Sequence, residues 1–89
     1  MNDVPDTTPV SKLRNLGPSS TKMLADIDVH TAGDVRTLGI PLVLHILRSK
    51  GIMVSMNLAY ALYAGLRDVH WLELDQATKE SLREACSDD

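Results

Sequence analysis

The sequence of 89 residues is poor in the residues that build aromatic cores and covalent cross-links. It contains no Phe, one Trp, two Tyr and one Cys. The single cysteine, Cys86, excludes an internal disulfide and a zinc site made of several cysteines. A core without phenylalanine must be built from Leu, Ile, Val, Met and Ala, most of which are favourable or tolerable helix formers. The length suits one domain with a single modest core.

Long apolar runs and a basic N-terminus are also missing. The longest stretch without a charged residue, 51–66, is shorter than the roughly 20 residues that cross a bilayer as a helix. The first ten residues include two Asp and neither Lys nor Arg, unlike the positively charged start of a secretory signal. We therefore expect a cytoplasmic protein that has no contact with a membrane.

The formal net charge of −3 hides an uneven distribution. Residues 11–50 are mildly basic, whereas residues 68–89 are strongly acidic. The basic residues of the first region are Lys12, Arg14, Lys22, Arg36, Arg48 and Lys50, against Asp26, Asp28 and Asp34. Because Lys and Arg supply most of the non-specific affinity for DNA, any contact with nucleic acid would have to come from residues 11–50, and it would be weak.

The apolar residues repeat with the period of a helix rather than that of a strand. Thr31 and Asp34 fit a capping box, while Ser55 and Asp75 suit helix N-caps. The sequence predicts an all-α bundle of five or six short helices. The expected helices cover about residues 18–28, 32–38, 41–50, 56–67 and 76–86, after a short helical turn at 11–16. Residues 1–10 are expected to be a disordered lead-in, and residues 11–89 to form the domain.

Three expectations concern the core. The helix over 56–67 is apolar on most sides, which predicts that Leu62 lies in the centre of the molecule. In the last helix, Leu82, Ala85 and Cys86 are expected to face inward. Trp71 is expected to close one end of the core.

The most informative stretch is Asn15-Leu16-Gly17-Pro18-Ser19-Ser20-Thr21. Pro18 suits the first turn of a helix, and Gly17 is expected to give the chain a tight turn before it. The free N–H groups at a helix N-terminus attract anions. The candidate phosphate- or DNA-binding residues are Asn15, Gly17, Ser19, Ser20, Lys22, Lys12 and Arg14. The alternative is a hairpin that only positions two helices, and the residues leave both interpretations open.

Several motifs together resemble the C-terminal domain of the TfoX/Sxy regulators of natural transformation, over about residues 11–86. They are Leu13-x-Asn15-Leu16-Gly17-Pro18-x-Ser20, Leu24-x-x-Ile27-x-Val29-x-Thr31-x-x-Asp34, Leu58-x-x-Ala61-Leu62 and His70-Trp71. The resemblance implies a helix-hairpin-helix or SAM-like bundle. It also implies a regulatory role in competence, transformation or transcription. Full-length members carry an N-terminal α/β domain for which this chain has no room, so we expect a stand-alone domain.

Within the helix-hairpin-helix class, Asn15 stands where the turn normally has its first Gly, and Gly17 matches the second. Asn tolerates a positive φ better than most residues do, so the resemblance implies that the turn is kept. Lys22 stands one turn later than the lysine that usually begins the second helix.

Two functions remain open at this stage. The first is a non-enzymatic regulatory module with weak, sequence-independent DNA contact through Leu16–Lys22. The second is a protein-interaction or homo-oligomerising module without DNA binding. The histidines at 30, 45 and 70 are too scattered for a metal motif, and we expect no catalytic residue, cofactor or small-molecule substrate. Convergence of Lys12, Arg14, Lys22 and Arg36 on the hairpin would favour DNA, whereas Asp26 and Asp28 on that face would favour a protein partner.

Overall fold

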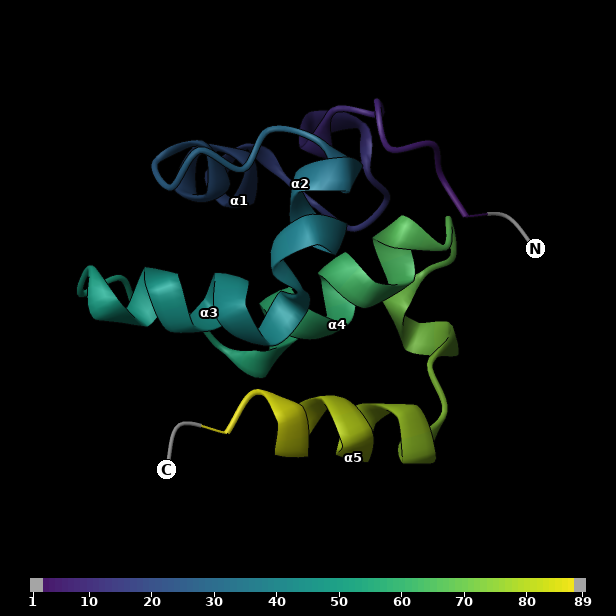
Figure 1. The fold of residues 1–89 in the computed structure, drawn as a ribbon. Coiled ribbons are helices and arrows are strands. Elements are labelled where there is room, and N and C mark those ends of the chain that lie inside the picture. Colours follow the sequence, from purple (N-terminus) through teal and green to yellow (C-terminus); the bar gives the residue numbers. More distant parts are fainter. Residues whose placement is uncertain (1–2, 88–89) are drawn as a thin grey trace.

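The computed structural model describes residues 3–87, and these form an all-α bundle as predicted (Figure 1). Its helices are α1 (Pro18–Ala25), α2 (Ala32–Leu38), α3 (Ile40–Ser49), α4 (Met56–Leu66) and α5 (Gln76–Ala85), with short 3-10 turns η1 (Val10–Lys12) and η2 (Trp71–Glu73). Within residues 3–87, strand-like pairing is limited to one bridge between Pro9 and Thr31. No described helix is long and apolar enough to span a membrane.

The predicted caps are present. The Thr31 hydroxyl accepts a hydrogen bond from the Asp34 N–H, while the Asp34 carboxylate accepts from the N–H groups of His30 and Thr31. These backbone donors lower the pKa of Asp34. Ser55 and Asp75 cap α4 and α5. Helix α1 ends three residues earlier than predicted. The backbone of Asp28 is left-handed, with a φ of 61°, and it turns the chain back so that the next N–H donates to the Leu24 carbonyl.

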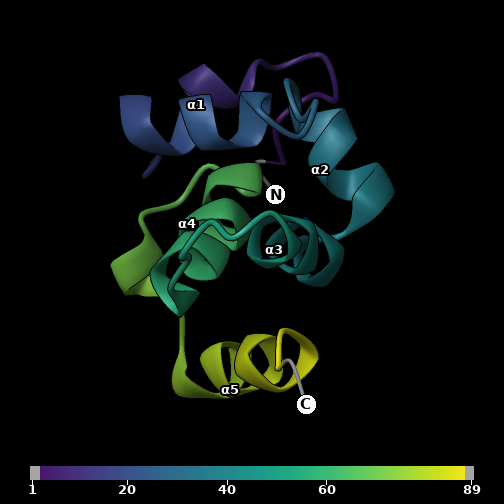
Figure 2. The ribbon, with the colours of Figure 1, turned by 90° about the vertical axis from the view of Figure 1, so that its left-hand side faces the viewer.

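Helix α4 lies in the middle of the molecule, between a layer that contains α1 and the last helix, α5 (Figures 1 and 2). Eight of its residues are buried, and Leu62 is completely inaccessible, as predicted. Helix α3 packs beside α4 through Val43, Leu44 and Leu47. By contrast, Leu24 is the one buried residue of α1, so both flanks of that short helix remain accessible.

The chain before α1 reaches α4 closely because residue 65 is glycine. A Cβ atom at Gly65 would lie 2.7 Å from the Arg14 carbonyl oxygen and 3.4 Å from the Cβ of Leu13. Any larger residue would therefore have to displace backbone. Gly65 thus fixes how near the hairpin lies to the central helix.

The N-terminal segment differs from the expected disordered lead-in. The Val4 N–H donates to the Leu66 carbonyl at 2.9 Å, and the Ala32 N–H donates to the Thr8 carbonyl at 2.8 Å. Val10 is buried, with an exposed fraction of 3%. Isolated valines show no periodicity that sequence reasoning can detect, yet they dock this segment to the helices. The first two residues lie outside the described part of the chain.

The last helix also corrects one prediction. Leu82 and Cys86 are buried as expected, but Ala85 is exposed. Leu82 and Cys86 are four residues apart and share one stripe of the helix, whereas Ala85 lies on its flank. Burial raises the pKa of the Cys86 thiol, which leaves it less of the reactive thiolate form.

Candidate functional site

The sharp turn of the hairpin is made by Asn15 and not by Gly17. Asn15 is left-handed with a φ of 78°, as its place in the motif implied. Gly17 is extended, with a φ of −104°, and a Cβ there would meet no atom within 4 Å. The expectation that Gly17 supplies the tight turn is therefore wrong. Gly17 instead serves as the N-cap residue of α1.

Asn15 has a second role, in contacts with residues far from it in the chain. Its side-chain amide donates to the Val69 carbonyl at 3.0 Å, and its side-chain oxygen accepts from the Trp71 N–H at 3.2 Å. These bonds join residues more than fifty positions apart in the chain. They fasten the hairpin to the turn that carries Trp71.

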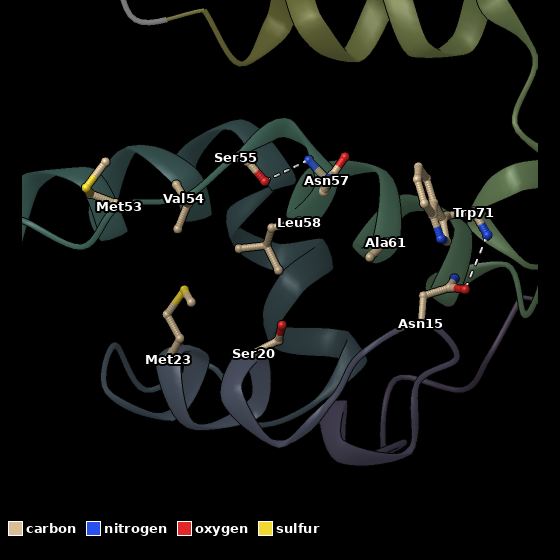
Figure 3. Close-up of a pocket in the computed structure, with 10 residues that line it drawn as sticks. All are labelled: Asn15, Ser20, Met23, Met53, Val54, Ser55, Asn57, Leu58, Ala61 and Trp71. Atoms are coloured by element: carbon tan, nitrogen blue, oxygen red, sulfur yellow. Dashed lines mark hydrogen bonds between the residues drawn. The ribbon is translucent and has the colours of Figure 1, made fainter.

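Four of the seven residues proposed for phosphate binding line two separate depressions on α1, and Lys12, Arg14 and Ser19 line neither. The outer depression, of about 440 Å³, is lined by Ser11, Leu16, Gly17, Pro18, Thr21, Lys22 and Ala25. The inner cleft, of about 330 Å³, is lined by Asn15, Ser20, Met23, Met53, Val54, Ser55, Asn57, Leu58, Ala61 and Trp71 (Figure 3). At 3.6 residues per turn, the α1 residues of the two sets project from opposite sides of the helix. The single candidate site therefore becomes two surfaces.

The outer depression holds Gly17 and Lys22 of the original set. Lys22 and Lys12 are exposed, and the side chain of neither makes an ion pair or hydrogen bond within residues 3–87. The first two free N–H groups of α1, on Ser19 and Ser20, have no partner there either. Among the described residues, no carboxylate lines the depression. This surface offers one free cation, Lys22, and a helix start, and Lys12 follows its lining residue Ser11 in the chain.

The four basic residues do not converge on the hairpin. Arg14 lies 3.4 Å from a carboxylate oxygen of Asp68, and Arg36 pairs with Asp6 at 2.6 Å. The second guanidinium nitrogen of Arg36 donates to the Leu66 carbonyl, which draws this side chain toward the end of α4. One turn after Lys22, Asp26 occupies the same stripe of α1. The four cations are therefore not gathered into one basic patch on the hairpin.

The inner cleft is uncharged. None of its ten described lining residues is Asp, Glu, Lys, Arg or His. Ser20 and Met23 form the α1 wall, while Leu58 and Ala61 form the α4 wall (Figure 3). Met53 stands at one end with 96% of its surface exposed. Trp71 stands at the other end, half-buried, and so forms a wall of the cleft instead of closing the core.

Polar groups at the cleft are free to bind a partner. The side chains of Ser20, Asn57 and Trp71 make no hydrogen bond to any other residue in the described part of the chain. The Ser20 hydroxyl points into the cleft toward Leu58 (Figure 3). The cleft thus combines an apolar floor with a few hydrogen-bonding groups, which is the usual composition of a recognition site.

The histidines do not assemble into a cluster. Within residues 3–87, no three His, Cys, Asp or Glu side chains stand close enough to hold a metal ion. His70 caps η2 by accepting from the Leu72 N–H, and His30 lies 3.9 Å from Asp28 on the surface.

The bundle, with its hairpin and its two depressions, is a small all-α domain. Residues 6–86 match the TfoX C-terminal domain, and the chain belongs to that family. The match includes residues 6–10, the segment that packs against the helices. Neither a curated protein nor a solved structure matched the chain.

Proposed function

We propose that this domain is a non-enzymatic regulatory module that binds a protein through the cleft between α1 and α4. The observation that carries the proposal is the uncharged cleft of about 330 Å³, walled by Met23, Leu58 and Trp71. Methionine side chains adapt their shape to apolar partners, and Trp is enriched where binding energy concentrates. A neutral, apolar segment with one large side chain is the partner that this cleft fits.

The charges support a protein partner over DNA as the main ligand. Affinity for a phosphate backbone grows with the number of free Lys and Arg side chains. Arg14 and Arg36 are held by carboxylates of the same chain, and the whole chain carries a net charge of −3. Lys12 and Lys22 alone would neutralise few phosphates.

Weak DNA contact remains the second candidate, supported by Lys22 in an outer depression that no described carboxylate lines. Such contact would be sequence-independent, because a helix N-terminus and two lysines meet phosphates and not base edges. It would suit a role in competence, transformation or transcription regulation. The two candidates use opposite sides of α1, so each can be tested without disturbing the other.

A displayed library of short random peptides tests the cleft directly. Ser20→Trp places a large ring in the cleft from the α1 wall, and Lys22→Glu changes only the outer side. We expect selected peptides to be neutral and apolar, to bind the wild type and Lys22→Glu equally, and to lose at least tenfold in affinity for Ser20→Trp. Circular dichroism should show both variants to be helical. Peptides that bind Ser20→Trp as well as the wild type would overturn the proposal.

A further inference from the structure

We infer that Met53 is a site of reversible oxidation by hydrogen peroxide, and that its sulfoxide lowers the affinity of the cleft between α1 and α4 for apolar partners. The effect on affinity rests on the proposed function, because it describes how binding in that same cleft is regulated. The exposure of Met53, its fixed place at one end of the cleft and the protection of the other described sulfur atoms support the inference.

Met53 carries the most accessible sulfur atom in the described part of the chain. Its side chain stands almost entirely in solvent, with 96% of the residue exposed, whereas Met23 and Met56 are half-buried and pack against the core. Cys86 is buried, and this burial raises the pKa of its thiol, which leaves little of the reactive thiolate. An oxidant in solution therefore reaches the thioether of Met53 first.

The backbone on both sides of Met53 holds its thioether outside the core. Ile52 and Val54 are half-buried and pack against the core. The Ile52 N–H donates to the Leu47 carbonyl at 3.0 Å, and Ser55 caps α4. Because the chain is fastened before and after this residue, Met53 cannot turn inward without breaking these contacts.

The reaction needs hydrogen peroxide as its one co-reactant. A lone pair of the Met53 sulfur attacks one peroxide oxygen, the O–O bond breaks and an S–O bond forms. The other oxygen leaves as water with both hydrogens of the peroxide, so the sulfur is oxidised and the peroxide is reduced. Methionine sulfoxide reductases convert the sulfoxide back to the thioether, and the modification is therefore reversible.

The position of Met53 connects its oxidation to the cleft. Met53 and Met23 stand on opposite walls at the same end of the cleft, with Val54 between them (Figure 3). Oxidation converts a flexible apolar side chain into a polar, chiral one. A partner that covers the sulfoxide must remove its water, and the side chains of Met23 and Val54 have no hydrogen-bond donor to replace it. An apolar partner should therefore bind the oxidised chain more weakly.

Peptide mapping by mass spectrometry tests the oxidation site in the whole chain. After treatment with hydrogen peroxide, Met53 is expected to gain an oxygen atom at least about ten times faster than Met23 or Met56, because oxidation follows exposure. Circular dichroism should show that the oxidised chain stays helical. Oxidation of Met23 or Met56 as fast as that of Met53 overturns the inference.

Selected cleft-binding peptides that contain neither Met nor Cys test the effect on affinity. The oxidised chain should bind them at least about fivefold more weakly, since a polar oxygen loses its water on binding. Treatment with methionine sulfoxide reductases should restore the affinity. Met53→Leu keeps an apolar side chain and every other methionine, so peroxide should leave its affinity for the peptides unchanged. Equal binding by the oxidised and untreated wild type, or an equal loss in Met53→Leu, overturns the inference.

The Ser20→Trp variant separates this regulation from the function on which it rests. Peptides that require the open cleft, yet bind equally well after oxidation of Met53, would exclude the regulation and leave the protein-binding function in place. Peptides that bind Ser20→Trp as well as the wild type would exclude the function and, with it, the regulation, whatever the rate of oxidation at Met53.

Discussion

The two sides of α1 show how one short helix presents two unlike surfaces. Its outer side carries Thr21 and Lys22 beside an open helix start, whereas its inner side carries Ser20 and Met23 against α4. Leu24 is the one fully buried residue of the helix, and Met23 packs against the core while it also lines the cleft. Both flanks keep exposed surface that is available for binding. The difference in charge then decides which partner each flank can take.

The comparison also explains why a motif identified in sequence splits in space. Asn15, Gly17, Ser19, Ser20 and Lys22 form one run along the chain, yet a helix turns by about 100° per residue. Residues two or three apart therefore face different neighbours. The motif indicates that a hairpin exists, and the packing of that hairpin on α4 decides what each side chain contacts.

The largest effect on stability should come from truncating Leu24, the buried residue between the two sides of α1. Leu24→Ala is expected to cost about 2–5 kcal/mol of the free energy of unfolding, because it leaves a cavity at a fully buried site. Leu62→Ala in α4 should cost as much, for the same reason. Urea unfolding followed by circular dichroism measures both.

Ala25→Ser, on the exposed flank of α1, is the control for Leu24→Ala and should change stability by less than about 0.5 kcal/mol. A loss at Leu24→Ala as small as that of the control would mean that α1 is held by contacts other than this leucine. The separation into two independent flanks would then be wrong.

The second test compares Gly65, where the hairpin meets α4, with Gly17, where α1 begins. In Gly65→Ala the new Cβ would lie 2.7 Å from the Arg14 carbonyl oxygen. Such overpacking costs about 1–3 kcal/mol, and the helix preference for Ala offsets up to about 1 kcal/mol of it. Gly17→Ser should instead be stabilising by a few tenths of a kcal/mol, since Ser is a slightly better N-cap than Gly and the site is open. Thermal unfolding of the two variants should therefore shift in opposite directions, and equal shifts would contradict the close approach at Gly65.

The third test removes the link between the hairpin and the inner cleft. Asn15→Gly keeps the left-handed turn but loses the bonds to Val69 and Trp71, at a cost of about 1–2 kcal/mol. Asn15→Ala also loses the tolerance for a positive φ and should cost about 1–2 kcal/mol more. Because Trp71 is the single Trp of the chain, its fluorescence reports the wall of the cleft in both variants. If Asn15→Ala were as stable as Asn15→Gly, the left-handed conformation of residue 15 would not affect the free energy of unfolding.

Features of the fold with local determinants are predictable from the sequence. The caps at Thr31, Ser55 and Asp75 depend on residues within one turn of the helix, and all three are present. The burial of Leu62 followed from the apolar pattern of its own helix. Such features need no knowledge of the rest of the chain.

Contacts between residues that are far apart in the chain are not predictable in this way. The pairing of Arg14 with Asp68 and of Arg36 with Asp6 removes two cations from the expected cluster. The inner cleft joins Asn15, Met23, Met53 and Trp71, which come from four separate segments. No spacing rule predicts such a grouping, because it depends on how α1 settles on α4. Whether a carboxylate lies close enough to pair with Arg14 or Arg36 likewise depends on the fold and not on the motif.

The smallest effect is expected on the outer side, in a titration of duplex DNA at low salt. With Lys12 and Lys22 as the two free cations of the hairpin, the slope of log affinity against log salt should be about −1 to −2. Lys22→Glu should remove most of this binding and leave peptide binding in the cleft unchanged, because Lys22 projects away from the cleft. Lys50→Glu makes the same charge change outside the outer depression and is the matched control. If Lys22→Glu and Lys50→Glu lost DNA affinity equally, the binding would depend only on the net charge of the chain. The outer side of α1 would then not be a specific site for DNA.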